Sequence, residues 1–133
     1  MSTIRRFEDL EVWKKARELN QLFYKFVREG RFKPDPDLER QMKKSCGSIM
    51  DNIAEGFDRG SNKEFIQFLF IAKSSGSEYK SQLYRAVDRK FLISEEMREL
   101  YELTDEINKM IQGLVDYLSS SDIQGKKHRK SPT

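Results

Sequence analysis

The chain has 133 residues, of which 37% are hydrophobic and 35% are charged, and its net charge is +3. This length predicts one domain, and the high charged fraction requires the apolar residues to be concentrated on element faces. A single cysteine, Cys46, excludes an intrachain disulfide, and a single histidine, His128, argues against His-based catalysis and His-ligated metals. The longest apolar run, residues 68–72, is too short for a membrane span and the start lacks a signal-peptide core, so we expect a cytoplasmic protein without membrane contact.

The first half of the chain predicts two helices, because apolar residues recur there at the three- and four-residue spacing of a helix face. The first covers about residues 9–29 and ends at Gly30. The second covers about 36–56, with Asp35 as N-cap, Pro36 at the first helical position and Gly56 as a left-handed C-cap. The two apolar stripes are Val12, Ala16, Leu19, Phe23 and Phe26, and then Leu38, Met42, Cys46, Ile49 and Ile53.

The second half predicts two longer helices. Ser61 and Glu64 form a capping box that opens a helix running to about residue 90, and Ser94 caps a last helix that runs to about 119. Short connections make successive helices antiparallel neighbours, and no segment alternates with period two. We therefore predict an all-α, antiparallel up-down-up-down four-helix bundle over residues 1–120, followed by a disordered basic tail over 121–133.

The bundle has more apolar surface than four helices need among themselves. Apolar positions of the first helix span about 200° of arc, against a stripe of roughly 100° that suffices for packing. Residues 65–72 of the third helix are apolar nearly all round. Either the core is oversized with a few exposed aromatics, or a second face is buried against another copy, which is the reading we favour. The candidate interface residues are Phe68, Phe70 and Ile71, and mid-helix Gly47 and Gly76 suggest close helix approach within or between subunits.

Several motifs occur in a fixed order along the chain. Residues 7–13 read Phe-Glu-Asp-Leu-Glu-Val-Trp, residues 52–56 read Asn-Ile-Ala-Glu-Gly, and Arg59 follows. Lys63-Glu-Phe65 and Ala72-Lys-Ser-Ser75 come next. Together they resemble a bacterial four-helix-bundle family first named for open reading frames inside intervening sequences of large-subunit ribosomal RNA genes, and formerly labelled a ribosomal protein.

The resemblance covers about residues 7–118 and extends to a superfamily that includes the accessory variability proteins of diversity-generating retroelements. It implies a homopentameric ring of antiparallel bundles and no known catalytic reaction. For the retroelement members it implies a basic surface that contacts nucleic acid and a reverse transcriptase partner. This chain departs from the usual pattern with Lys73-Ser74 in place of Arg-Gly, and with Lys43 and Lys44 where the family usually has an arginine-rich segment, so the charge is kept but the bidentate geometry is lost.

The family signature residues, Trp13, Asn52, Glu55, Gly56 and Arg59, allow two interpretations. Asn52 and Glu55 lie off the apolar stripe and could form a polar binding corner with Arg59. The interpretation we favour is structural: a hydrogen-bonded helix terminus in which Arg59 pairs with a carboxylate. Cys46 is expected to be a small buried hydrophobe, because no histidine is available to activate it.

Charge is unevenly distributed along the sequence. Lys and Arg outnumber Asp and Glu by five in residues 1–90, acidic residues exceed basic ones by six in residues 91–125, and residues 126–133 hold four basic residues and no acidic one. Each basic cluster is either a solvated helix face or a phosphate-binding surface. The candidate nucleic-acid-binding residues are Arg40, Lys43, Lys44, Lys80, Arg85, Arg89 and Lys90, together with the tail.

These observations predict a non-catalytic, oligomeric scaffold that binds RNA or DNA weakly through its basic surface. The alternative is a pure protein–protein interaction module, for example an accessory subunit of a reverse transcriptase, with no nucleic-acid binding of its own. An enzyme is disfavoured, because the carboxylates of the last helix lack the histidines of a di-iron bundle and no nucleotide-binding or nucleophile motif occurs. We therefore expect neither a cofactor nor a catalytic or metal site.

Overall fold

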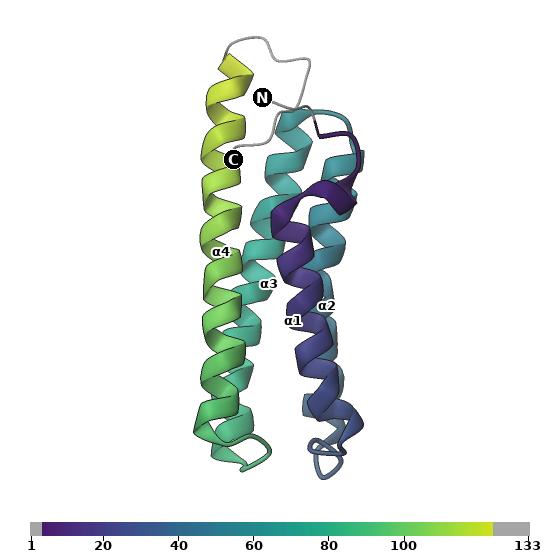
Figure 1. The fold of residues 1–133 in the computed structure, drawn as a ribbon, viewed down its shortest axis with the longest axis vertical. Helices are drawn as coiled ribbons and strands as arrows, with labels where there is room; N and C mark the ends of the chain where they lie inside the picture. The colour runs from purple at the N-terminus through teal and green to yellow at the C-terminus, as the bar shows by residue number, and fades with distance from the viewer. Residues whose placement is uncertain (1–3, 124–133) are drawn as a thin grey trace.

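The computed structural model describes residues 4–123, and every regular element in that range is a helix. A short 3-10 helix, η1 (Phe7–Asp9), precedes α1 (Glu11–Arg28), α2 (Pro36–Asp58), α3 (Asn62–Asp88) and α4 (Ser94–Ile123). The four α-helices run alternately up and down, with the α1–α2 and α3–α4 connections at one end and the α2–α3 connection at the other (Figure 1). The predicted all-α bundle is confirmed. The predicted start of the tail at residue 121 is wrong, because α4 continues through residues 121–123. Residues 124–133 of the predicted tail lie outside the described residues.

Two helices begin at the caps that the sequence predicts. The Asp35 carboxylate accepts a hydrogen bond from the backbone N–H of Leu38 at 3.0 Å, and Pro36 follows it at the start of α2. The Ser61 hydroxyl accepts one from the N–H of Glu64 at 3.2 Å. Each bond satisfies a backbone donor that the first helical turn leaves unpaired.

The predicted end of α2 at Gly56 is wrong. The helix continues to Asp58, and the residue with left-handed backbone is Gly60, whose φ is +94°. Gly56 is instead buried inside the helix, where an added Cβ would lie 2.5 Å from the Cβ of Phe68 on α3. Gly56 is therefore required for the close approach of α2 and α3 rather than for helix termination.

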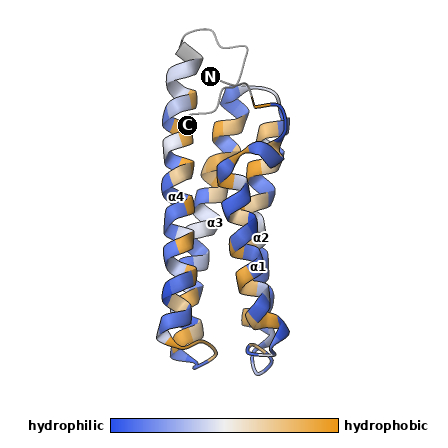
Figure 2. Cartoon of the chain, viewed as in Figure 1, coloured by the Kyte–Doolittle hydropathy of each residue, from blue (hydrophilic) through white to orange (hydrophobic). Residues whose placement is uncertain are grey.

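The core follows the predicted stripes. All ten apolar residues named above for the first two helices are buried, and hydrophobic and hydrophilic positions alternate along each helix (Figure 2). Near the end that holds the α1–α2 loop, the rings of Tyr79, Phe23, Phe32 and Phe91 contact one another in series. Their centroids are 5.4–5.6 Å apart and the contacts are edge-on, the arrangement that aromatic quadrupoles favour. This series joins α1 and α3 to the α1–α2 and α3–α4 loops.

Buried polar side chains fix the register of α2 against α3. The Ser45 hydroxyl donates to Gln82 Oε1 at 2.6 Å, and the Ser75 hydroxyl donates to the hydroxyl of Ser48 at 2.9 Å. These hydrogen bonds form in only one axial register of the two helices, since a shift of one turn would leave buried donors without acceptors.

The two mid-helix glycines differ. Gly76 lies against the side chain of Asn108 on α4, so its expected role in close helix approach within the subunit is confirmed. Gly47 has no atom within 4 Å of the position that a Cβ would take. It therefore makes no close helix contact inside the bundle, and a contact between subunits stays a prediction.

Candidate nucleic-acid interface

The structure brings the basic residues of early α2 and late α3 to the same end of the bundle. Because the two helices are antiparallel neighbours, Arg85 donates to Gln41 Oε1 at 3.3 Å and Arg89 forms an ion pair with Asp35, the N-cap of α2. Lys90 follows Arg89, the C-cap of α3, and has a left-handed backbone, with φ +66°. We refer to the resulting surface as the basic face: Arg40, Lys43, Lys44, Arg85, Arg89 and Lys90.

Carboxylates partly neutralise the basic face. Arg40 pairs with Asp37, and Lys43 Nζ lies 3.8 Å from Glu39 and 5.8 Å from the centre of the Tyr24 ring. Exposed pairs of this kind on one helix contribute only a few tenths of a kcal/mol. A phosphate could therefore displace these carboxylates at small cost. Lys44 is exposed and takes part in no ion pair within residues 4–123.

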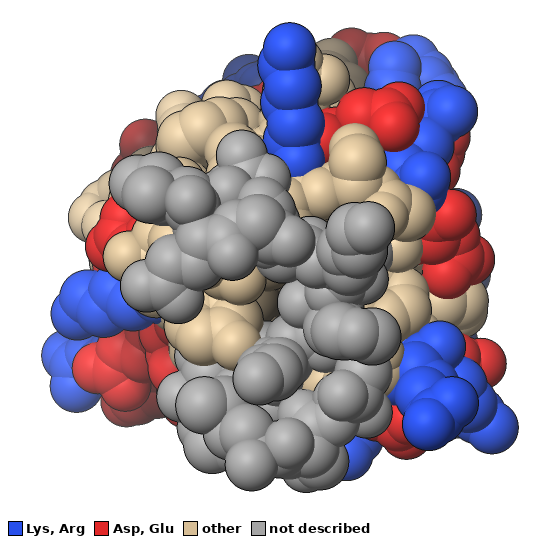
Figure 3. Space-filling view, turned by 90° about the horizontal axis from the view of Figure 1, so that it is seen from above, with Lys and Arg blue, Asp and Glu red and all other residues tan. Residues whose placement is uncertain are grey.

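Charge is separated along the bundle axis. The two segments that surround the α1–α2 and α3–α4 connections, residues 25–44 and 85–99, hold 11 Lys and Arg against 8 Asp and Glu. We call these two segments the loop end. The other residues from 4 to 123 hold 10 basic and 14 acidic residues. The loop end is thus +3 and the rest of the described chain is −4, and on the face seen at the opposite end the two signs alternate around the rim (Figure 3).

Lys80 does not join the basic face. Its ammonium lies 3.0 Å from Asp105 on α4 and 4.8 Å from the centre of the Tyr101 ring. Lys109 also pairs with Asp105, at 3.1 Å. Hydrogen bonds from Lys80 and Lys109 lower the pKa of Asp105. The side chain of Lys80 therefore belongs to the contact between α3 and α4, away from α2.

The signature residues make contacts within the subunit. Asn52 donates to both the carbonyl and the hydroxyl of Ser48 at 2.8 Å, so it lies inside α2 rather than at the helix terminus that the sequence suggested. Arg59 Nη2 lies 3.6 Å from Glu55, and its guanidinium lies 5.0 Å from the centre of the Phe68 ring. Trp13, the remaining signature residue, packs edge-on against Phe7 with centroids 5.1 Å apart.

An uncharged apolar patch lies on the outer side of α3. Phe70 and Ile71 are each 48% exposed, whereas Phe68 is half-buried over Gly56. Gln67, Ser74 and Ser77 are the exposed neighbours of this pair along α3. We call these five residues, Gln67, Phe70, Ile71, Ser74 and Ser77, the α3 outer face.

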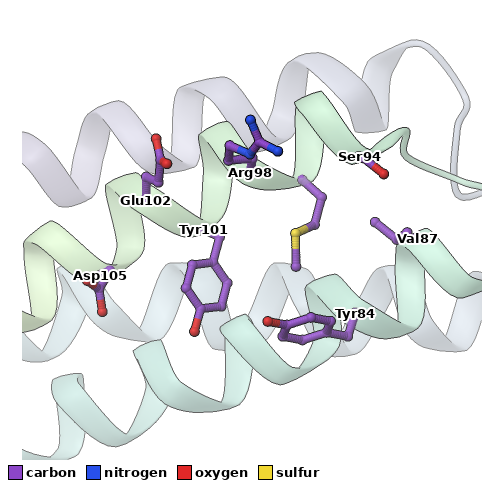
Figure 4. A pocket seen from close by; sticks show the side chains of 8 residues that line it. Tyr84, Val87, Ser94, Arg98, Tyr101, Glu102 and Asp105 are labelled. Atoms are coloured by element: carbon purple, nitrogen blue, oxygen red, sulfur yellow. The ribbon is translucent and has the colours of Figure 1, made fainter.

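A second open surface, which sequence reasoning missed, is a groove between late α3 and early α4 (Figure 4). Its volume is about 460 Å³. The lining residues are Tyr84, Val87, Ser94, Met97, Arg98, Tyr101, Glu102 and Asp105. Tyr84 is 56% exposed, and its ring meets that of Tyr101 with centroids 5.9 Å apart. The signal that could have found it is Tyr84, an aromatic residue that lies off the core stripe of its helix.

The part of the chain that the structure describes contains no group of three or more His, Cys, Asp or Glu side chains placed to hold a metal ion. Cys46 is fully buried, as predicted, and burial raises the pKa of its thiol. None of the described helices is long and apolar enough to cross a membrane.

The fold and its surfaces define an antiparallel four-helix bundle with one basic end. The profile of the family described as "23S rRNA-intervening sequence protein" matches residues 8–113, and the chain belongs to that family. A solved structure with the same fold is a protein of unknown function from the S23 ribosomal protein family of Bacteroides thetaiotaomicron. The two chains are 21% identical with a TM-score of 0.70, over 78% of this chain and 97% of that one. No curated protein matches the chain significantly.

Proposed function

We propose that this protein is a non-catalytic scaffold that self-associates and binds RNA or DNA through the phosphate backbone, using the basic face. The observation that carries this proposal is the convergence of Arg85 and Arg89 from α3 on the first turns of α2. Local potential rather than net charge governs the attraction of a polyanion, so a positive end outweighs the −1 total of residues 4–123.

The chemistry of the basic face favours weak binding without sequence preference. Its cations lie on helix exteriors and most already have a carboxylate or amide partner, so they offer point charges rather than a shaped site for base edges. Self-association multiplies such a surface, and several weak contacts on one strand add up to useful affinity.

The test is fluorescence anisotropy of labelled single-stranded RNA with the full chain at 50 and 200 mM salt. Lys44→Glu/Arg85→Glu changes two exposed cations of the basic face, whereas the control Arg17→Glu/Lys63→Glu changes two exposed cations away from the loop end, with the same net charge. We expect the first variant to bind at least tenfold more weakly and to show a smaller salt dependence, since fewer counterions are released. The control should bind like the unmodified chain.

A chain with Lys126, Lys127, Arg129 and Lys130 changed to glutamine separates the folded part from the tail. If only this chain loses binding, the tail is the nucleic-acid-binding element and the proposed role of the basic face is wrong. If the unmodified chain binds no RNA or DNA at 50 mM salt, nucleic-acid binding is rejected altogether.

If nucleic-acid binding is rejected, the second candidate function is a protein-interaction module. The observation that favours it is the α3 outer face. Two large apolar side chains stand exposed there among neutral residues in a chain that is 35% charged, and contiguous apolar surface commonly marks an interaction site.

A further inference from the structure

The groove between α3 and α4 has an aromatic and apolar floor. Tyr84 and Val87 line it from α3, and Met97 and Tyr101 line it from α4. The two tyrosine rings meet edge-on, and Tyr84 remains more than half exposed (Figure 4). A side chain that entered the groove would therefore contact an aromatic face at once.

The rim of the groove is acidic. Glu102 and Asp105 line it, and Glu102 also belongs to a row of exposed carboxylates at three- and four-residue spacing along α4. We call this row the acidic stripe: Glu95, Glu99, Glu102 and Glu106. Of the stripe, Glu106 pairs with Lys15, whereas Glu95, Glu99 and Glu102 form no ion pair within residues 4–123. Asp105, beside the stripe, pairs with two lysines.

Aromatic rings beside unpaired carboxylates complement a cationic side chain. A guanidinium or ammonium is attracted by the face of a tyrosine ring and forms charge-assisted hydrogen bonds with carboxylates. The same carboxylates repel phosphate, so the groove is unsuited to the nucleic acid that the basic face would bind. Among the residues that line the groove, Arg98 is the single cation, and Lys80 of the bundle already lies against the Tyr101 ring, so Tyr84 is the ring that an entering cation would meet.

We infer that this groove and the acidic stripe bind the basic segment of a second copy of this chain. Residues 126–130 read Lys-Lys-His-Arg-Lys, with four positive charges and no negative one. One cation of this segment enters the groove and lies on the exposed ring of Tyr84, and the others pair with Glu95, Glu99 and Glu102. This segment is the occupant that we propose because its charge is opposite to that of the acidic stripe, and because every copy of the chain carries one.

The dimensions of the chain exclude a copy's own segment from the far part of the acidic stripe. From Glu99 and Glu95 to the end of α4 at Ile123, the helix measures about 36 Å and about 42 Å at 1.5 Å per residue. From Ile123, a fully extended chain reaches about 24 Å by Lys130, and an extended lysine side chain adds about 6 Å. The basic residues of one copy therefore stop short of its own Glu99 and Glu95, and a contact with these two carboxylates links one copy to the next.

The test is zero-length carbodiimide cross-linking of the full chain, which joins a lysine amine to a contacting carboxylate. Unlabelled and uniformly ¹⁵N-labelled chains are mixed in equal amounts at low salt, and the linked peptides are identified by mass spectrometry. We expect links from Lys126, Lys127 or Lys130 to Glu95, Glu99 or Glu102 in which one peptide is labelled and the other is not. At 0.5 M salt these links should disappear.

Two tyrosine variants show whether the groove itself is used, because both leave every carboxylate in place. Tyr84→Ala removes the exposed ring of the groove, and Tyr24→Ala removes an exposed ring on α1 as the matched control. We expect the mixed-isotope links to fall at least fivefold in Tyr84→Ala and to be unchanged in Tyr24→Ala. They should also be unchanged in Lys44→Glu/Arg85→Glu, so this result is independent of nucleic-acid binding.

Four results would each overturn the inference. Links that never mix isotopes would place the segment on its own copy. Links spread evenly over the acidic residues of all helices would show attraction without a site. Equal yields of mixed-isotope links from the two tyrosine variants would exclude the groove as the binding site. An absence of links would show that the basic segment does not bind there.

Discussion

At the scale of single residues, two glycines in one helix have opposite surroundings. Gly56 faces the Cβ of Phe68, whereas Gly47 faces open space. Helix propensity favours alanine over glycine at both positions by about 1 kcal/mol, so packing alone decides which replacement the bundle tolerates.

Gly56→Ala is expected to lower the free energy of unfolding by about 2 kcal/mol, because Phe68 and the α3 backbone must shift to admit a methyl group. Gly47→Ala should raise it by up to about 1 kcal/mol. Urea unfolding followed by circular dichroism measures both changes, with Gly47→Ala as the matched control. Equal effects from the two replacements would contradict the tight approach of α2 and α3 at Gly56.

At the scale of elements, one arginine joins the two connections at the loop end. Arg31, in the α1–α2 loop, donates two hydrogen bonds to the carboxylate of Glu96 on α4, at 2.8 and 2.7 Å, and a third to the carbonyl of Phe91 at 3.2 Å. Glu96 also accepts from the backbone N–H of Ile93 at 3.0 Å. Bidentate geometry of this kind is the strongest form of the arginine–carboxylate pair.

This pair makes stability dependent on pH. The hydrogen bonds from Arg31 lower the pKa of Glu96 in the folded chain, so its contribution is complete above the unfolded pKa of about 4.3 and is lost as pH falls through the folded value. Arg31→Met should cost about 1 kcal/mol at pH 7, and the difference from the unmodified chain should shrink below pH 4.

The measurement is urea unfolding at pH 7, 4 and 3, with Arg28→Met, an exposed change at the end of α1, as the control. Arg31 also lies over the Phe26 ring, 5.2 Å from its centre. A cost for Arg31→Met that stays the same at every pH would therefore assign its role to packing and contradict the ionic contribution.

The sequence predicts the four helices because their signals are local. Asp35, Ser61 and the apolar stripes act within a few residues of themselves, and each was found where expected. Arg31 and Glu96 are 65 positions apart, and Phe68 meets Gly56 only after α2 and α3 have packed. For the groove, the sequence signals Tyr84 as an aromatic residue off the core stripe, but not its partner Tyr101, which comes from a different helix.

The candidate site was predicted in composition but not in arrangement. Sequence reasoning selected the cations of α2 and α3, yet it grouped Lys80 with Arg85 because both are in late α3. The ammonium of Lys80 meets Asp105 on α4, whereas Arg85 reaches Gln41 on α2. Which side of a helix faces which neighbour depends on the rotation of that helix in the bundle, and charge counts along the chain contain no information about that rotation.

At the scale of the whole molecule, the α3 outer face predicts self-association. Light scattering at micromolar concentration should give a mass several times the 15.8 kDa of one chain, and the family resemblance suggests five copies. Phe70→Glu and Ile71→Glu should each shift the mass toward one chain, because burying a carboxylate in an apolar contact is costly.

Ile93→Glu is the control, since it places the same charge on an exposed apolar residue outside the α3 outer face. A mass of one chain for the unmodified protein would refute self-association. Dissociation by Ile93→Glu alone would move the interface to the α3–α4 connection.

The separation of charge along the bundle gives residues 4–123 an electric dipole. A polyanion exerts a torque on such a molecule before contact and turns the +3 loop end toward itself, whereas the −4 remainder is turned away. Encounter is therefore oriented even though the described chain is slightly anionic overall. For the chain in which Lys126, Lys127, Arg129 and Lys130 are changed to glutamine, the association rate with heparin or RNA should still fall with ionic strength as it does for a basic protein, since the Debye length, about 10 Å at 0.1 M salt, is shorter than the bundle and hides its far, acidic end.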